Sequence, residues 1–282
     1  MVQKKSAHFT DITDITDITD QTLWTRIRTI HSQSGAWSSF SAMKTLMVFD
    51  FDHTVVDDNS DIWVLRCLPG KVLPGHVKST YTKGHWTKYM GNVMEYIGEQ
   101  KVTSDQIRIV METIPFTDGM TELLTYISKH KDSVDCIVVS DSNTLFIEWI
   151  LEAAGLRAAV DHVFSNPAHI NNRGYMEVRS HHSHSCSKCP VNMCKQEVLQ
   201  LYLSEQSQRG VEYKKVFYVG DGGNDLCPTA CLKDQDVVMP RRGFTLEKQL
   251  SQLQNQSACS VRPRVSAWSS ANEILAELKE SV

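Results

Sequence analysis

The sequence predicts an α/β fold with a Rossmann-like core, in which helices alternate with the strands of a parallel sheet. Three short apolar runs carry this prediction, because each run is followed at once by residues with carboxylate or hydroxyl side chains. Helical patterns lie between the runs, and an alternation of strands and helices is typical of parallel sheets. Ligands of such sheets bind beyond the carboxyl ends of the strands, so the polar residues there predict one shared site.

Each expected strand is short, apolar and bounded by polar residues, as buried parallel strands are. The expected strands are 45–49 before Asp50 and Asp52, 136–139 before Ser140 and Asp141, 215–219 before Asp221, and the less certain runs 163–164 and 237–239. Between them, apolar residues at helical spacing predict helices around 123–127, 146–151 and 198–203, the second of them capped by Asn143.

The domain organisation follows from where apolar residues are scarce. Residues 1–43 hold a Thr-Asp-Ile repeat and a stretch rich in Ser and Gly, so we expect a disordered extension with at most a short helix near 22–30. Residues 44–282 should form the folded domain. About 85 residues separate Thr54 from Ser140, more than one crossover needs, so we expect a mostly helical cap inserted at about 58–120.

Composition excludes several classes of partner. The chain has 282 residues, a net charge of −4 and no long basic run, so neither nucleic acid nor a membrane surface is an expected partner. No apolar stretch reaches the roughly 18–20 residues of a membrane span. The first residues show no signal-peptide pattern, so we expect a cytoplasmic protein whose eight cysteines are thiols rather than disulfides.

Asp50 and Asp52 are the first candidate catalytic pair. In a regular strand they would point to opposite sides, so the chain must turn directly after Asp50 for the two carboxylates to converge. One carboxylate can then attack phosphorus while the other exchanges a proton with the leaving oxygen. Two anions that face a phosphate repel it, so this chemistry also requires a cation and hydrogen-bond donors.

The other strand ends supply those groups. Asp221 can complete a Mg²⁺ site of oxygen ligands, and Ser140 can donate to a phosphoryl oxygen. Lys195, at the start of a predicted helix, is the preferred source of positive charge over Lys188, Lys214 and Lys215. Asn224 and Asp225 follow Asp221 in a glycine-rich turn, where the backbone can approach a ligand closely.

Asp-x-Asp-x-Thr after an apolar run, then a Ser, a Lys and Gly-Asp-Gly-x-Asn-Asp, resembles the haloacid dehalogenase superfamily of phosphatases. Asp50, Ser140, Lys195 and Asp221 match that pattern in order, while His53 stands where many members carry Gly. The longer segments DFDHTVVDDNSD, SDSN and HSHSCSKCP resemble the branch of vertebrate phosphatases that act on pyridoxal phosphate or on phosphoethanolamine and phosphocholine. This resemblance covers residues 44–282. Over the whole chain the sequence looks closer to the pyridoxal phosphate branch.

The resemblance implies Mg²⁺-dependent hydrolysis of a small phosphorylated metabolite, most simply pyridoxal 5′-phosphate. Asp50 would be the nucleophile that forms an aspartyl-phosphate, and Asp52 the general acid and base. Asp50, Asp221 and the Asp52 carbonyl would hold the metal, while Ser140 and Lys195 bind phosphoryl oxygens. Asp61 and Asp141 would contact the substrate, where carboxylates suit a cationic group. Phosphoethanolamine or phosphocholine remains the alternative substrate, and phosphoryl transfer to a sugar the alternative reaction.

A cluster of histidines and cysteines precedes Lys195: His181, His182, His184, Cys186, Cys189 and Cys194. The Cys-x-x-Cys spacing is typical of zinc sites, but no second cysteine pair at finger spacing follows. We therefore expect free thiols packed beside Lys195, with a zinc site or a reversible Cys186–Cys189 disulfide as alternatives. Cys227 and Cys231, one helical turn apart, are expected to be core residues. A metal-binding module on an inactive core is the non-enzymatic hypothesis.

Overall fold

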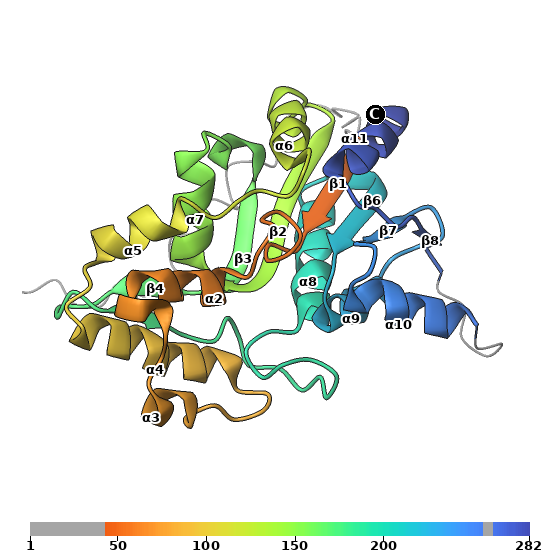
Figure 1. Ribbon diagram of the computed structural model, residues 1–282. Helices are drawn as coiled ribbons and strands as arrows, with labels where there is room; N and C mark the ends of the chain where they lie inside the picture. The colour runs from red at the N-terminus through yellow and green to blue at the C-terminus, as the bar shows by residue number, and fades with distance from the viewer. Residues whose placement is uncertain (1–42, 256–261) are drawn as a thin grey trace, which may run out of the picture. The chain divides into compact units, whose positions relative to one another are not determined.

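A computed structural model describes residues 43–255 and 262–282 (Figure 1). Six parallel strands form the main sheet, in the order β3-β2-β1-β6-β7-β8. Their bounds are β1 (Met43–Phe49), β2 (Val134–Asn143), β3 (His162–Asn166), β6 (Glu212–Gly220), β7 (Val237–Pro240) and β8 (Arg264–Val265). The predicted disordered extension and the helix near 22–30 lie outside the described residues, except that Met43 begins β1.

The order of the strands creates the site. From β1 the chain moves outward to β2 and β3, and it then returns to the other side of β1 to form β6, β7 and β8. This is the strand order of a doubly wound sheet, whose topological switch point lies between β1 and β6. Phe49 of β1 is in register with Val138 of β2 and Val219 of β6, so all three strands deliver their next residues to one edge.

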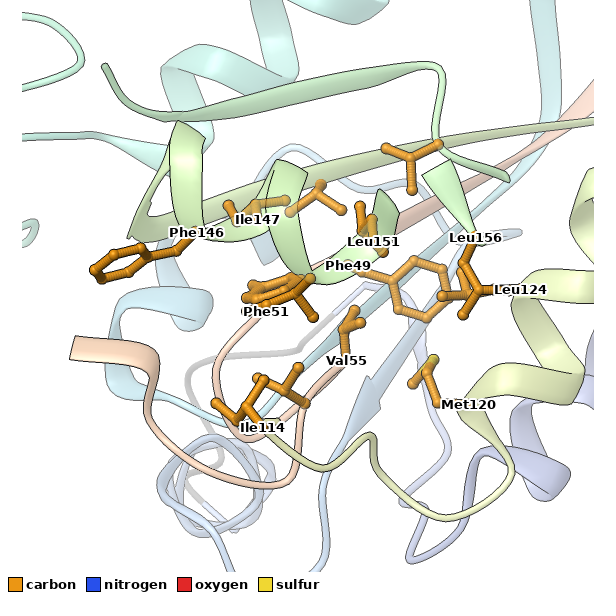
Figure 2. Packing of buried hydrophobic residues seen from close by; sticks show 14 of the residues in the cluster. Phe49, Phe51, Val55, Ile114, Met120, Leu124, Phe146, Ile147, Leu151 and Leu156 are labelled. Atoms are coloured by element: carbon orange, nitrogen blue, oxygen red, sulfur yellow. The ribbon is translucent and has the colours of Figure 1, made fainter. Parts of the chain in front are cut away.

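Alternating side chains of the central strands face two separate layers. Met47 and Phe49 contribute to one buried cluster, and Leu46 and Val48 to the other. Figure 2 shows part of the first cluster, where Phe49 lies among side chains of two helices that cover this face. Helices α6 (Met120–Lys129), α7 (Thr144–Ala153) and α11 (Ala271–Ser281) contribute to the first cluster, and α8 (Lys195–Gln208) and α10 (Thr245–Gln254) to the second.

Most predicted core elements are confirmed, with two differences. Asn143 caps α7 as expected, because its side-chain oxygen accepts a hydrogen bond from Phe146 N at 3.0 Å. Strand β2, however, runs on to Asn143, so Ser140 and Asp141 lie inside the strand rather than after it. The extended backbone continues there through a shift of register opposite β3, and it ends only where the cap of α7 begins. The two-residue strand β8 was not predicted.

Helices dominate the segment between Asp52 and α6. They are α2 (Ser60–Trp63), α3 (Gly75–Lys78), α4 (Trp86–Glu99) and α5 (Ser104–Met111), with two 3₁₀ turns at Val64–Cys67 and Pro69–Lys71. The antiparallel hairpin of β4 (Ala168–Ile170) and β5 (Met176–Val178) packs against α4, where Gly98 leaves room for the ring of Tyr175. This hairpin was not predicted, because three-residue strands carry no readable periodicity. Within the described ranges, no helix is long and apolar enough to cross a bilayer.

Candidate active site

Asp50 and Asp221 lie side by side because they follow neighbouring strands at the switch point. Asp50 continues the ladder, since its N–H donates to Val219 O at 2.9 Å. The chain then turns at once, with the amides of Thr54, Val55 and Val56 all donating to Phe51 O. This turn brings Asp52 back toward the same cavity, as the sequence required for the two carboxylates to converge.

His53 sits in the turn with a φ of +54°. Left-handed backbone favours glycine and is uncommon for other residues, which gives a conformational reason for the glycine common at this position in the resembled family. The His53 carbonyl accepts a hydrogen bond from Arg241 Nη1 at 2.7 Å, and its ring lies 5.7 Å from that of Phe244. Contacts to the β7–α10 segment thus hold the turn in this conformation.

Lys195 is the buried cation of the site. Its ammonium lies 2.9 Å from Asp50 Oδ1 and 2.8 Å from Asp225 Oδ1, and its side chain is 1% exposed. Burial lowers the pKa of Lys195, but Asp225 and Asp50 raise it more, so this lysine stays charged. The other lysines considered, Lys188 among them, make no such contact in the described part of the chain.

Asp225 organises the glycine-rich turn around that cation. Its Oδ1 also accepts from the Tyr218 hydroxyl at 2.7 Å, while its Oδ2 accepts from the backbone amides of Asp221 and Gly222. Gly220 permits this arrangement, because a Cβ there would lie 2.6 Å from the Asp225 carboxylate. Asp225 is therefore fully occupied as an acceptor, and its part in the site is to position Lys195 and the Asp221 backbone.

Asp50 itself is buried, and only one of its two carboxylate oxygens has partners among the described residues. Its Oδ1 accepts from Phe51 N at 2.7 Å as well as from Lys195, whereas no hydrogen bond to Oδ2 occurs among the described residues. Burial and the negative charge of Asp225 raise the pKa of Asp50 well above its usual value, against the opposing effect of Lys195. A second cation beside this carboxylate would keep it charged.

Asp52 lines the same cavity as Asp50. Its Oδ1 accepts from Ser60 N at 3.0 Å, at the start of α2. Burial raises the pKa of Asp52 to about 6, because only the contacts with Ser60 and the distant Lys195 favour the charged form. A carboxyl group with such a pKa is suited to both donating and accepting protons near neutral pH.

Asp61 and Trp86 bring the helical segment into the cavity. Trp86 Nε1 donates to Asp61 Oδ2 at 2.6 Å, and Asp61 is 6% exposed. Burial, together with the charge of Asp52, raises the pKa of Asp61 to about 8. Trp86 was not singled out from the sequence, because only the folded helices determine that it lies at the cavity.

Ser140 and Asp141 reach the cavity from β2. Ser140 Oγ accepts from Ser142 N at 3.2 Å, which leaves its hydroxyl hydrogen free to donate. Both carboxylate oxygens of Asp141 accept from amides, one from Asn192 at 2.7 Å and the other from Asn224 at 2.6 Å. The sequence singled out Asn224 only as part of its turn and did not find Asn192, whose role depends on how the preceding loop folds.

These side chains surround one cavity of about 230 Å³. All but one of the predicted site residues line it, since Lys195 lies beneath the floor in contact with Asp50. The lining residues are Asp50, Asp52, His53, Asn59, Asp61, Trp86, Ser140, Asp141, Ser142, Asp221, Gly222 and Asn224.

The floor has the composition of a Mg²⁺ site. Carboxylate oxygens of Asp50, Asp221 and Asp225 lie within 4.8 Å of one another, and hard oxygen donors of this kind suit Mg²⁺. Burial and the charge of Asp225 raise the pKa of Asp221 to about 7, so the excess of buried negative charge favours a bound cation. Because Asp225 is already occupied by four donors, Asp50 and Asp221 are the better ligands.

Comparison with known proteins identifies the family. A family model described as "Putative Phosphatase" matches residues 45–282. The chain belongs to this family. A human protein named pyridoxal phosphate phosphatase PHOSPHO2 is 46% identical over 84% of this chain and 98% of its own length. A human phosphoethanolamine/phosphocholine phosphatase is 38% identical over 88% of this chain and 93% of its own. The protein is thus a phosphatase, and the hypothesis of an inactive core is wrong.

Solved structures confirm the expected fold class. A phosphoserine phosphatase in its apo form superposes with a TM-score of 0.53 at 16% identity, covering 83% of this chain and 98% of that one. At this identity the likeness concerns the fold alone. Together with the six-stranded parallel sheet, it confirms the predicted α/β fold with a Rossmann-like core.

Proposed function

We propose that this phosphatase hydrolyses a small phosphate monoester through an aspartyl-phosphate on Asp50, with Mg²⁺ as cofactor. The observation that supports this proposal most directly is the difference between the two oxygens of the Asp50 carboxylate. One oxygen is fixed by Lys195 and by the Phe51 amide, and the other has no hydrogen-bond partner among the described residues. A carboxylate fixed in this way presents one oxygen for attack at a constant orientation.

The first chemical step transfers the phosphoryl group to this oxygen. As Asp50 Oδ2 forms a bond to phosphorus, the bond to the ester oxygen breaks, and the protonated carboxyl of Asp52 gives its proton to that leaving oxygen. In the second step Asp52, now ionised, takes a proton from a water that attacks phosphorus. Phosphate leaves, and both aspartates return to their starting states. The pKa of Asp52, raised by burial to about 6, suits both duties.

The remaining groups hold the phosphoryl oxygens. Lys195 uses two of its three N–H donors on Asp50 and Asp225, which leaves one for substrate, and the Ser140 hydroxyl can donate a second hydrogen bond. Asp50, Asp221 and the Asp52 carbonyl would hold Mg²⁺. When bound, the metal supplies positive charge that offsets the carboxylates and the developing charge on phosphate.

Pyridoxal 5′-phosphate is the proposed substrate. Asp141 gives one wall of the cavity a negative character, and Asp61, whose pKa is raised to about 8, can lose its proton when a pyridinium approaches. The adjoining Trp86 ring suits a flat aromatic partner. The more similar of the two human relatives is also the one named for this substrate. The alternative is phosphoethanolamine or phosphocholine, because an ammonium group would satisfy the same carboxylates.

The proposal also covers the domain boundaries and the cellular compartment. We regard residues 58–120 as a cap on the domain 44–282, because Asp61 and Trp86 from this segment close one side of the cavity. We place the protein in the cytoplasm, with a small phosphorylated metabolite as its partner rather than nucleic acid or a membrane. Residues 1–43 are proposed as an extension outside the catalytic domain.

A substrate panel tests the proposal. Values of kcat/KM would be measured for pyridoxal 5′-phosphate, phosphoethanolamine, phosphocholine and phosphoserine, with Mg²⁺ and with excess chelator. We expect Mg²⁺-dependent phosphate release with the highest kcat/KM for pyridoxal 5′-phosphate. A preference for an amine phosphate would overturn the substrate, and folded protein inactive on every monoester would overturn the reaction. Asp50→Asn, checked for folding by circular dichroism, measures contaminating phosphatase.

A further inference from the structure

Four cysteine sulfurs gather beside the active site, from segments that are distant in the sequence. The Sγ atoms of Cys186, Cys189, Cys194 and Cys227 all lie within 4.8 Å of one another. The closest pairs are Cys186–Cys227 at 3.8 Å and Cys189–Cys194 at 3.7 Å. Three of these residues belong to the loop before α8, and the fourth lies in α9 (Leu226–Thr229). The expectation of a core position for Cys227 missed this contact.

We propose that these four cysteines form a structural zinc site. Zinc bound to four thiolates is tetrahedral with Zn–S distances of about 2.3 Å, which places the sulfurs about 3.8 Å apart. The two closest pairs already have this separation, and the others need to close by an ångström or less. The sulfur of a disulfide partner would instead lie at about 2.05 Å, so the cluster has the dimensions of a metal site rather than of two disulfides.

His182 and His184 make hydrogen bonds within the loop, so we assign the metal site to the four cysteines alone rather than to a mixture of cysteines and histidines. His184 Nε2 lies 2.7 Å from Pro190 O, and its Nδ1 accepts from the Cys186 amide. His182 Nε2 accepts from the Cys194 amide at 3.3 Å. Both rings thus brace the loop that presents the cysteines.

A zinc ion here would stabilise both segments that position the catalytic lysine. Residues 179–194 contain no helix or strand, and a structureless loop of this length is costly to order. Cys194 directly precedes Lys195, and Cys227 follows Asp225 in the next turn of the chain. A shared metal would therefore fix the start of α8 to the turn whose Asp225 holds Lys195.

Metal analysis of the full chain tests the proposal. Protein purified in reducing buffer without added zinc and without chelator would be analysed by mass spectrometry for metals. We expect one zinc per chain in the wild type and in Asp50→Asn, and nearly none in Cys186→Ser or Cys227→Ser. Cys231→Ser is the matched control, because Cys231 is a half-buried neighbour whose thiol donates to Pro228 O outside the cluster. It should retain its zinc.

Cobalt exchange covers the case in which the serine variants fail to fold. Replacing zinc by Co²⁺ in the wild type should give intense thiolate-to-cobalt charge-transfer bands and the d–d bands of a tetrahedral site. The proposal is overturned if the folded wild type holds no zinc and its four thiols react freely or appear as disulfides by mass. Zinc that is substoichiometric and unchanged in Cys227→Ser would equally overturn it.

Discussion

The two ends of the catalytic cavity handle buried charge in opposite ways. At the floor, the buried cation of Lys195 and several N–H donors already compensate part of the negative charge of Asp50 and Asp225. At the outer wall, formed by Asp52, Asp61 and Trp86, each carboxylate receives a hydrogen bond from one neighbouring residue, and no ion pair occurs there within the described ranges. The floor therefore contains a compensating cation before substrate binds, whereas the wall does not.

This difference assigns different tasks to similar residues. Charge that is compensated in advance keeps the nucleophile fixed, so the floor serves the phosphoryl group whatever molecule carries it. Uncompensated carboxylates are costly in isolation and become favourable only when a positive group approaches, so the wall serves to select the substrate. Substitutions at the floor should therefore affect every substrate, and those at the wall should affect cationic substrates most.

The largest effect is expected at the nucleophile. Asp50→Asn should lower kcat by about 10⁴-fold or more for every substrate, because an amide oxygen cannot form the covalent intermediate. Steady-state assays and thermal unfolding would be measured together. The variant should remain folded, since Lys195 keeps Asp225 as a partner. Activity within tenfold of the wild type would refute the role of Asp50.

The next effect is expected when the cation of the floor is removed. Lys195→Met leaves Asp50 and Asp225 buried without their partner, so it should destabilise the fold by ~3–5 kcal/mol at neutral pH. It should also lower kcat/KM on all substrates by about 10²-fold or more. Urea unfolding measures the first effect, with the exposed Lys188→Met as control. Equal stability of Lys195→Met and the control would contradict a charge-compensated floor.

A substitution at the wall should discriminate between substrates. Asp61→Asn keeps an acceptor for the Trp86 indole but, unlike Asp61, cannot lose a proton and become negative when a cationic group approaches. We expect kcat/KM for pyridoxal 5′-phosphate to fall by about tenfold or more, while that for the neutral-headed phenyl phosphate changes by less than about threefold. An equal loss on both substrates would show that Asp61 supports the fold rather than selecting a cation.

The same variant should also change the stability of the fold in a way that depends on pH. The pKa of Asp61 is raised from an unfolded value of about 3.9 to about 8 in the folded chain. Between these values the folded state binds more protons than the unfolded state, so stability falls as the pH rises through this window. Relative to Asp61→Asn, the wild type should lose about 3.5 kcal/mol between pH 5 and pH 8.

Thermal or urea unfolding of both proteins across that range, in the presence of chelator, measures this difference. Asp52 titrates in both proteins, so the difference between them reports Asp61 together with its coupling to Asp52. Parallel curves for the two proteins would mean that Asp61 is not protonated in the free enzyme.

Sequence reasoning recovered the floor of the site better than its wall. Asp50, Ser140 and Asp221 were found because buried apolar runs predict strands, and parallel strands deliver the residues at their ends to one edge. Lys195 followed from the order of motifs in the resembled superfamily, because its place at the start of a helix did not by itself distinguish it from Lys188, Lys214 and Lys215. These inferences depend on local pattern and on a general rule of topology, so no knowledge of loop conformation was needed.

The contacts that were missed are all set by tertiary packing. Trp86 reaches Asp61 only because α4 folds back over the sheet edge, and Asn192 meets Asp141 only through an irregular loop. Cys227 joins Cys186 across the whole of α8 and β6, a separation that no spacing rule predicts. The hairpin of β4 and β5 was missed because its strands have three residues each.

The most direct test of the account is to trap the intermediate. Wild-type enzyme turning over pyridoxal 5′-phosphate with Mg²⁺ would be quenched in acid, digested and analysed by peptide mass spectrometry for an acyl phosphate. The account predicts phosphate on Asp50 and on no other residue, with none in Asp50→Asn. Turnover with no covalent phosphate in the wild type, or with phosphate on a different side chain, would contradict it.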